Sequence, residues 1–297
     1  MSDQKRLFLV DAYALIFRGY YAFIKNPRIN SKGLDTSAIM GFMNSLLDVI
    51  KRERPDHLAV CFDKGGSVDR VEMFEAYKAN RDETPEAIKV AVPYIYEILK
   101  AMHIPIMVKE GFEADDVIGT LSKQAEKEGY KTFMVTPDKD FAQLVSENIF
   151  MYRPKSFGGG YETWGIPEVQ KKFEVTDPLQ VIDFLGMMGD SSDNIPGLPG
   201  VGEKTAKKFL AAYGSMENLL ANTADLKGKM KAKHEIFVIE VDDIDEWKFF
   251  AKMSRNWACS LRQSREINMN SRLISNTTFM PSIKQKVEHV DSFFVYL

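Results

Sequence analysis

The sequence predicts an α/β fold with a mainly parallel central sheet flanked by helices. Three short apolar runs, residues 7–10, 58–62 and 131–136, are each followed within two residues by an aspartate, which indicates buried strands. Segments with helical spacing lie between them. Strands that alternate with helices form a largely parallel sheet, and ligands bind such a sheet beyond the carboxyl ends of its strands.

The helices between these strands are predicted from the spacing of their apolar residues. They occupy residues 37–52, 85–102 and 114–128, and Gly129 provides a stop signal after the third. The order of strand, helix and strand therefore continues through the first half of the chain.

Beyond residue 177 the pattern becomes helical, with glycine and proline in the stretch IPGLPGVGEKTAKKFL. This predicts two short helices joined by a tight hairpin. We expect three regions: an α/β domain over 1–176, a helical subdomain over 177–232 and a divergent extension over 233–297. The extension has no glycine and one proline, and the sequence assigns it no role.

The composition is that of an ordinary globular protein, with 45% hydrophobic and 27% charged residues in a chain of 297. It excludes collagen-like, disordered and disulfide-scaffold classes. The two cysteines, Cys61 and Cys259, lie far apart, and no histidine or cysteine pair has ligand spacing, so a structural zinc site has no support. No apolar run reaches the ~18 residues of a membrane span. We expect a soluble, cytoplasmic monomer that binds no membrane.

Nine acidic residues concentrate at predicted strand ends and helix starts. Any one of them alone is as readily explained as a helix cap. Their spacing, three residues on a helical turn or two on an extended strand end, directs pairs of carboxylates to one side. Converging carboxylates need cations among them, and an all-oxygen set suits Mg²⁺ or Mn²⁺. The nine are Asp11, Asp63, Glu113, Asp115, Asp116, Asp138, Asp140, Asp190 and Asp193.

The net charge of −3 argues mildly against a nucleic-acid partner when it is taken alone. Without the nine acids, however, 33 acidic residues face 39 basic ones, so the rest of the chain is cationic. Lys78 and Arg81, with Tyr77 beside them, are candidates for phosphate contact, although an isolated basic pair more often lies on a solvated helix face. The backbone amides of PGVGEKT, with Lys204 and Lys207, offer a second phosphate contact.

Other known functional motifs do not match the residues of this sequence at the spacing that they require. The lysine of GLPGVGEKT falls one place late for a Walker A loop, and no strand precedes it. Gln143 occupies the position where a calcium loop that started at Asp138 would need glycine. Tyr13 stands where a phosphoaspartate hydrolase would need its second aspartate, and the four histidines form no pair or triad.

Five segments occur in the order of a known set of motifs: VDAYALIFRGYYA, FEAYKANRDETP, GFEADDVIGT, TPDKDFAQLV and GDSSDNIPGLPGVGEKTAKKF. They resemble the 5′-nuclease domain of bacterial DNA polymerase I, a member of the flap endonuclease family, over about residues 5–232. The resemblance implies the family's PIN-like fold and a metal-dependent phosphodiesterase that removes 5′ flaps and RNA primers from branched duplex DNA in replication and repair. It also implies two Mg²⁺ or Mn²⁺ ions, and a DNA polymerase as a partner.

The resemblance also assigns roles to residues. It implies that the nine acids are metal ligands, directly or through water, and that Lys78 and Arg81 act on the scissile phosphate from a helical arch near residues 68–90. It gives Tyr77 a stacking contact. The hairpin resembles the family's helix-hairpin-helix, which holds duplex backbone and a K⁺ ion. Its predicted DNA contacts are Gly200, Gly202, Lys204, Thr205 and Lys207, and we expect a bulky side chain at Gly202 to clash with both the turn and the DNA.

The chain departs from the family pattern in two places. Ala12 replaces a glycine that commonly follows the first aspartate, a small change. From about Lys233 the sequence no longer follows the expected helical ending. Two other functions stay open: a non-catalytic scaffold that binds branched DNA, and an RNase of the related PIN-like fold. The complete acidic set argues against the scaffold, and the duplex-binding hairpin argues against the RNase.

Overall fold

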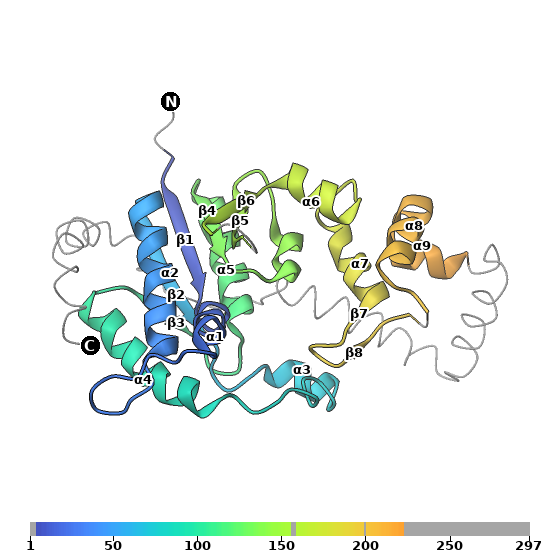
Figure 1. The fold of residues 1–297 in the computed structure, drawn as a ribbon. Coiled ribbons are helices and arrows are strands. Elements are labelled where there is room, and N and C mark those ends of the chain that lie inside the picture. Colours follow the sequence, from blue (N-terminus) through green and yellow to red (C-terminus); the bar gives the residue numbers. More distant parts are fainter. Residues whose placement is uncertain (1–3, 156–158, 199, 223–297) are drawn as a thin grey trace.

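The computed structural model describes residues 4–155, 159–198 and 200–222, and its centre is a six-stranded sheet (Figure 1). The strands lie in the order β3-β2-β1-β4-β5-β6, and only β5 and β6 pair in antiparallel fashion. They span β1 (Arg6–Asp11), β2 (His57–Phe62), β3 (Ile106–Val108), β4 (Lys131–Val135), β5 (Ile149–Pro154) and β6 (Tyr161–Trp164). The predicted α/β class with a mainly parallel sheet is confirmed.

Helices cover both faces of this sheet. Alternate side chains of β1 divide between two hydrophobic clusters, with Leu7 and Leu9 in one and Phe8 and Val10 in the other. Burial on both faces explains why the strand is apolar along its length. One face carries α1 (Ala12–Phe23), α2 (Ser37–Glu53) and α4 (Glu86–Ala101); the other carries α5 (Ala114–Lys127), the 3₁₀ helix η1 (Lys139–Leu144), α6 (Ile166–Phe173) and α7 (Gln180–Met188).

The predicted strands and helices of the first half are present, with ends that differ by one or two residues. The prediction did not identify β3, β5 or β6. Strand β3 has three residues, too few for a periodic pattern, and the side chains of β6 are only partly buried. Short strands of this kind take their conformation from the neighbours with which they pair.

Helices α1 and α2 touch through two glycines. A Cβ atom placed on Gly41 would lie 2.3 Å from the Cα atom of Gly19, which is closer than such atoms approach in proteins. The two helices can therefore pack at this distance only while both positions lack a side chain. Because α1 begins directly after Asp11, this contact also fixes the direction in which the chain leaves β1.

We expect Gly41→Ala to lower the free energy of unfolding by about 1–3 kcal/mol, because the added methyl group forces the helices apart. Helix propensity alone would favour alanine by up to about 1 kcal/mol, so the sign of the change identifies the contact. Urea unfolding followed by circular dichroism measures it. Gly202→Ala is the control, since a Cβ atom there meets nothing within 4 Å. Equal stability of wild type and Gly41→Ala would contradict the packing argument.

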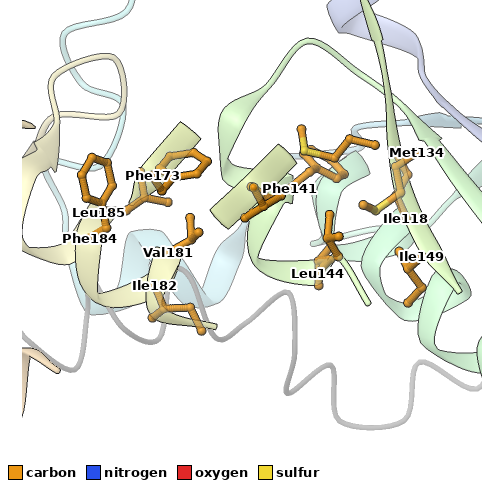
Figure 2. Packing of buried hydrophobic residues seen from close by; sticks show 14 of the residues in the cluster. Ile118, Met134, Phe141, Leu144, Ile149, Phe173, Val181, Ile182, Phe184 and Leu185 are labelled. Carbon is orange, nitrogen blue, oxygen red and sulfur yellow. The ribbon is translucent and has the colours of Figure 1, made fainter. Parts of the chain in front are cut away.

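The chain after α6 continues as α7, a two-stranded hairpin and two further helices. The hairpin consists of β7 (Gly189–Asp190) and β8 (Ile195–Pro196), and α8 (Glu203–Tyr213) and α9 (Met216–Ala221) follow it. Two helices are thus present as α7 and α8, but the β7–β8 hairpin and further chain join them where the sequence predicted one tight hairpin. In Figure 2, Val181 and Phe184 of α7 belong to the same buried cluster as Phe141 and Leu144 of η1. One hydrophobic core therefore continues across residue 176, and the extension 233–297 lies outside the described residues.

The segment expected to form a helical arch, residues 68–90, is helical at its two ends. It contains α3 (Val68–Met73) and the first turn of α4, with turns and extended chain over residues 74–85. In Figure 1 it passes beside the β7–β8 hairpin. No helix in the described ranges is long and apolar enough to cross a membrane.

Candidate metal and nucleic-acid site

A pocket of about 370 Å³ contains five of the nine predicted carboxylates. Asp115 reaches it from the first turn of α5, Asp138 and Asp140 from the start of η1, and Asp190 and Asp193 from the β7–β8 hairpin. Four cations line the same pocket: Lys78, Arg81, Lys139 and Arg153. The pocket lies beyond the carboxyl ends of the parallel strands, which is where the strand order predicted a site.

Asp11 is the last residue of β1 and Asp63 follows β2, a neighbouring strand of the sheet. The Asp11 carboxylate caps α1 by accepting from the Ala14 amide at 3.1 Å and accepts from the Thr136 hydroxyl at 3.0 Å. The Asp63 carboxylate accepts from the amide of Ala114. Burial raises the pKa of Asp11 to about 7 and that of Asp63 to about 6, and nearby carboxylates add to both shifts. A bound cation would relieve this cost.

Glu113 and Asp116 form a reciprocal cap at the start of α5. Both carboxylates are buried, and both pair with one buried arginine, Arg70 of α3. Its Nη1 lies 2.7 Å from Glu113 Oε2, its Nη2 lies 2.7 Å from Asp116 Oδ1, and Asp115 Oδ1 is 3.6 Å away. Burial alone would raise the pKa of Glu113, but the charges of Arg70 and Lys78 lower it. The pKa of Asp116 is raised to about 7 by burial and by the neighbouring Asp115.

The predicted cations Lys78 and Arg81 also pair with carboxylates. Lys78 Nζ lies 2.7 Å from Glu113 Oε2, and the Arg81 guanidinium pairs with Asp193. Tyr77, expected to stack on DNA, is 7% exposed, and its hydroxyl lies 3.2 Å from both Glu113 and Asp193. Its ring could meet a base only after this segment had moved.

Further hydrogen bonds hold this segment to the hairpin loop. The Lys78 amide donates to the Asp193 carbonyl at 2.9 Å, and the Asn80 side chain donates to the Ser191 carbonyl at 2.7 Å. In the opposite direction, the Asn194 side chain donates to the Ala76 carbonyl at 2.8 Å. Lys78 has a positive φ of 57°, a conformation that these contacts hold in place. We call residues 76–81 and 190–194, joined in this way, the clasp.

The remaining acids flank η1 and the hairpin. Asp138 caps η1 by accepting from the Asp140 amide at 3.0 Å, and Asp190 accepts from the Ser192 amide at 2.8 Å. Asp140 is 6% exposed, and its Oδ1 atom has no hydrogen-bond partner in the described structure. Burial, followed by the charges of Asp138 and Asp190, raises its pKa.

The predicted acidic residues offer the type of ligand atom that a divalent cation prefers. All of the donors are carboxylate oxygens, the ligands that Mg²⁺ and Mn²⁺ prefer. Asp11, Asp63, Asp138 and Asp140 form no ion pair with a described lysine, arginine or histidine, and the buried Oδ1 of Asp140 needs a partner. Among the described residues, however, no three side chains already stand in coordinating positions. The cations of Arg70, Lys78 and Arg81 instead neutralise Glu113, Asp116 and Asp193.

The residues predicted to contact duplex backbone lie at the start of α8. Gly200 has a φ of +79°, Gly202 caps the helix, and Lys204 is exposed. Thr205 lies in the first turn, with its amide on the Gly202 carbonyl at 2.9 Å. Lys207 pairs with both Glu174 and Glu203 at 3.1 Å. Its charge is therefore less available to a phosphate than that of Lys204.

The expected clash within the turn at Gly202 is wrong. A Cβ atom there meets nothing within 4 Å, and the φ of −109° is open to any residue. The glycine is therefore not required by the fold of the turn, and only a ligand close to the backbone could require it.

Sequence analysis missed three cations at the site: Lys139, which stands between Asp138 and Asp140 in the sequence, and the more distant Arg70 and Arg153. Arg70 reaches Glu113 and Asp116 across 43 and 46 residues of chain. Arg153 lies on β5, a strand that the pattern did not reveal. No local spacing marks either residue, because each contact depends on how distant segments pack.

Comparison with known proteins gives two family-model matches that together span most of the chain. Residues 6–174 match the model described as "5′-3′ exonuclease, N-terminal resolvase-like domain", and residues 176–270 match "5′-3′ exonuclease, C-terminal SAM fold". Similarity to the family thus continues past residue 232, where the motifs alone placed its end.

Individual relatives agree with these matches. A 5′-3′ exonuclease of Aquifex aeolicus is 41% identical over 218 residues, which is 73% of each chain. DNA polymerase I of Bacillus caldotenax is 39% identical over 227 residues, 76% of this chain and 25% of that protein. This chain spans about a quarter of such polymerases. A crystal structure of the bacteriophage T5 flap endonuclease with DNA and metal ions has a TM-score of 0.65, with 20% identity over 96% of this chain and 100% of that one.

Proposed function

Because the chain belongs to the 5′-3′ exonuclease family, we propose that it is a structure-specific 5′ nuclease. It hydrolyses phosphodiester bonds of 5′ flaps and RNA primers on duplex DNA and requires two divalent cations, Mg²⁺ or Mn²⁺. The observation that carries this proposal is the convergence of five carboxylates in one pocket that Lys78 and Arg81 also line. The T5 flap endonuclease was solved with both DNA and metal ions, which supports the same substrate and cofactor class.

The four carboxylates without an ion pair, Asp11, Asp63, Asp138 and Asp140, are the first candidates to hold the ions. The other five complete the set directly or through water. When bound, divalent ions activate water and stabilise the charge that develops on the phosphate during in-line displacement. No protein nucleophile is needed, in agreement with the lack of a serine or histidine constellation.

The side chains of the clasp supply positive charge in addition to that of the ions. Lys78 and Arg81 line the pocket and carry the positive charge to neutralise a phosphate oxygen. Lys78 pairs with Glu113 and Arg81 with Asp193, so a substrate phosphate would have to replace these carboxylates. The start of α8 then binds the duplex behind the flap through free backbone amides and Lys204. A K⁺ ion at this turn stays a prediction.

The partners follow from the relatives. DNA polymerase I of Bacillus caldotenax carries the similar region within a much longer chain, so we propose that this chain acts together with a DNA polymerase. Strand synthesis creates the 5′ flaps that such a nuclease removes.

The deciding experiment measures cleavage of a labelled 5′-flap duplex in Mg²⁺ and in EDTA. A single-stranded DNA, a single-stranded RNA and a blunt duplex of the same sequence serve as competing substrates. We expect cleavage only with Mg²⁺ and fastest on the flap. Tight flap binding without cleavage would favour the scaffold, and preferential cleavage of single-stranded RNA would favour the RNase.

Arg81→Ala is expected to lower the single-turnover rate of flap cleavage by about 10²-fold or more while it weakens duplex binding only a few fold. The proposed partner of Arg81 is charge that grows in the transition state, so the loss falls on the rate. Rapid-quench kinetics and fluorescence anisotropy separate the two quantities. Equal losses in rate and affinity would make Arg81 an ordinary backbone contact.

Gly202→Val is expected to weaken flap-duplex binding and to reduce its salt dependence, with little effect on a single-stranded oligonucleotide. Because a Cβ atom at this position meets nothing within 4 Å, a loss of binding in a folded variant points to a clash with bound DNA. Anisotropy titrations in increasing KCl measure it, with Gly202→Ala as the intermediate case. Unchanged flap affinity in Gly202→Val would remove this turn from the DNA surface.

A further inference from the structure

One cation of the pocket stands apart from the ion pairs described above. Lys78, Arg81 and Lys139 each have a carboxylate partner, the last of them Asp190 at 3.8 Å. Arg153 also lines the pocket, yet it forms no ion pair with a described acidic residue. Its positive charge is therefore not neutralised by direct contact, in a pocket that five carboxylates line.

Two contacts fix the Arg153 guanidinium. Its Cζ atom lies 3.9 Å from the centre of the Trp164 ring, and its Nη2 atom donates to the Pro137 carbonyl at 2.8 Å. The register of β5 and β6 pairs Met151 with Trp164, so Arg153 and Trp164 are diagonal neighbours on the same face. The Trp164 indole nitrogen in turn donates to Glu162 at 3.0 Å, which holds the ring.

This arrangement prepares the guanidinium for an anion. Nε of Arg153 is buried and has no hydrogen-bond partner in the part of the chain that the structure describes. A guanidinium that is held in one orientation loses little side-chain entropy when it binds. Burial lowers the pKa of Arg153, so an approaching anion would also relieve the cost of desolvating its charge.

We propose that Arg153 is a phosphate-binding residue of the nuclease site, presented by Trp164 to a backbone phosphate of the DNA strand in the pocket. Phosphate is the ligand class because guanidinium binds phosphate oxygens in pairs. This inference rests on the proposed function. It adds a third element, the β5–β6 pair, to the clasp and the start of α8 as parts proposed to contact DNA.

A purely structural role is the alternative, because the bond to the Pro137 carbonyl also supports the residue before Asp138. Two conservative variants separate the roles. Arg153→Lys keeps the charge, while Arg153→Gln has a shorter side chain that keeps a hydrogen-bond donor near the position of Nε without the charge. If either variant or Arg153→Ala lost its thermal unfolding transition, the other two would still decide the question.

The experiment is equilibrium binding of a fluorescent flap duplex in EDTA, by anisotropy, over a series of KCl concentrations. We expect Arg153→Ala and Arg153→Gln to lose about tenfold in affinity at low salt and to reduce the slope of log affinity against log salt by about 0.9. Arg153→Lys should recover the slope. Arg52→Ala is the matched control, an exposed arginine paired with Asp48 on α2, near the opposite ends of the strands.

The ring is tested separately. Trp164→Phe keeps an aromatic face and should bind almost as wild type does, whereas Trp164→Leu should show part of the loss seen in Arg153→Ala. Equal binding by Trp164→Leu and Trp164→Phe would overturn the presenting role of the ring.

Two other results of the binding experiments would overturn the proposal that Arg153 binds phosphate. A wild-type slope in Arg153→Ala, or in Arg153→Gln, would show that the charge of Arg153 meets no phosphate. Either result leaves the proposed function intact as long as the wild-type chain cleaves flaps. A wild-type chain that neither bound nor cleaved flap DNA would overturn the proposed function and this inference together.

Discussion

Asp138→Asn is expected to reduce flap cleavage by about 10³-fold or more, while flap binding persists or strengthens. Loss of a ligand removes metal-ion stabilisation worth several kcal/mol, whereas loss of a negative charge favours binding of DNA. Asparagine keeps an oxygen that can accept from the Asp140 amide, so the cap of η1 remains. Single-turnover cleavage in Mg²⁺ and anisotropy in EDTA measure the two effects.

The matched control is Asp48→Asn, which removes an exposed carboxylate near the opposite ends of the strands and should leave both quantities unchanged. Near-normal turnover of Asp138→Asn in Mg²⁺ would show that Asp138 is not a ligand. Isothermal titration with Mn²⁺ gives an independent readout, because a lost ligand also lowers the metal affinity of the free protein.

Arg70→Met is expected to lower the free energy of unfolding by about 3–5 kcal/mol. It leaves Glu113 and Asp116 buried without their arginine, and methionine fills the space of the side chain but supplies no charge. Urea unfolding at neutral pH measures the loss. Arg52→Met, which removes an exposed partner of Asp48, should cost no more than about 1 kcal/mol.

A triple variant tests the cause. Adding Glu113→Gln and Asp116→Asn to Arg70→Met removes the buried negative charges and should restore much of the lost stability. If the triple variant were as unstable as Arg70→Met alone, packing of the arginine stem and not its charge would explain the loss.

The sequence predicted the sheet well and placed several of the acidic residues at the correct edge of it, because both depend on local patterns; their role as metal ligands stays a prediction. Buried strands such as β1 are continuous apolar runs, and the aspartate after each run marks its carboxyl end. A parallel sheet brings these ends to one edge, so the spacing along the chain was sufficient to place Asp11, Asp63 and Asp138 together.

The partners of these acids could not be predicted in the same way. Arg70, the clasp and the Arg153–Trp164 pair depend on contacts between segments that lie far apart in the sequence or on a strand without a clear pattern. Charge neutralisation in the pocket is therefore a tertiary property. The sequence shows which groups need a cation, but the fold decides which cations reach them.

The clasp also orders events during synthesis. All six strands are complete once residue 164 has been made, but residues 76–81 find their partners only when residues 190–194 emerge. At the usual rate of about 5–20 residues per second, the earlier segment waits on the order of 5–25 s for the later one. Between the synthesis of residue 164 and that of residue 190, the nascent sheet can form while its carboxyl edge lacks both Asp190 and Asp193. During translation, the central sheet can therefore fold before residues 190–194 are present to complete the pocket.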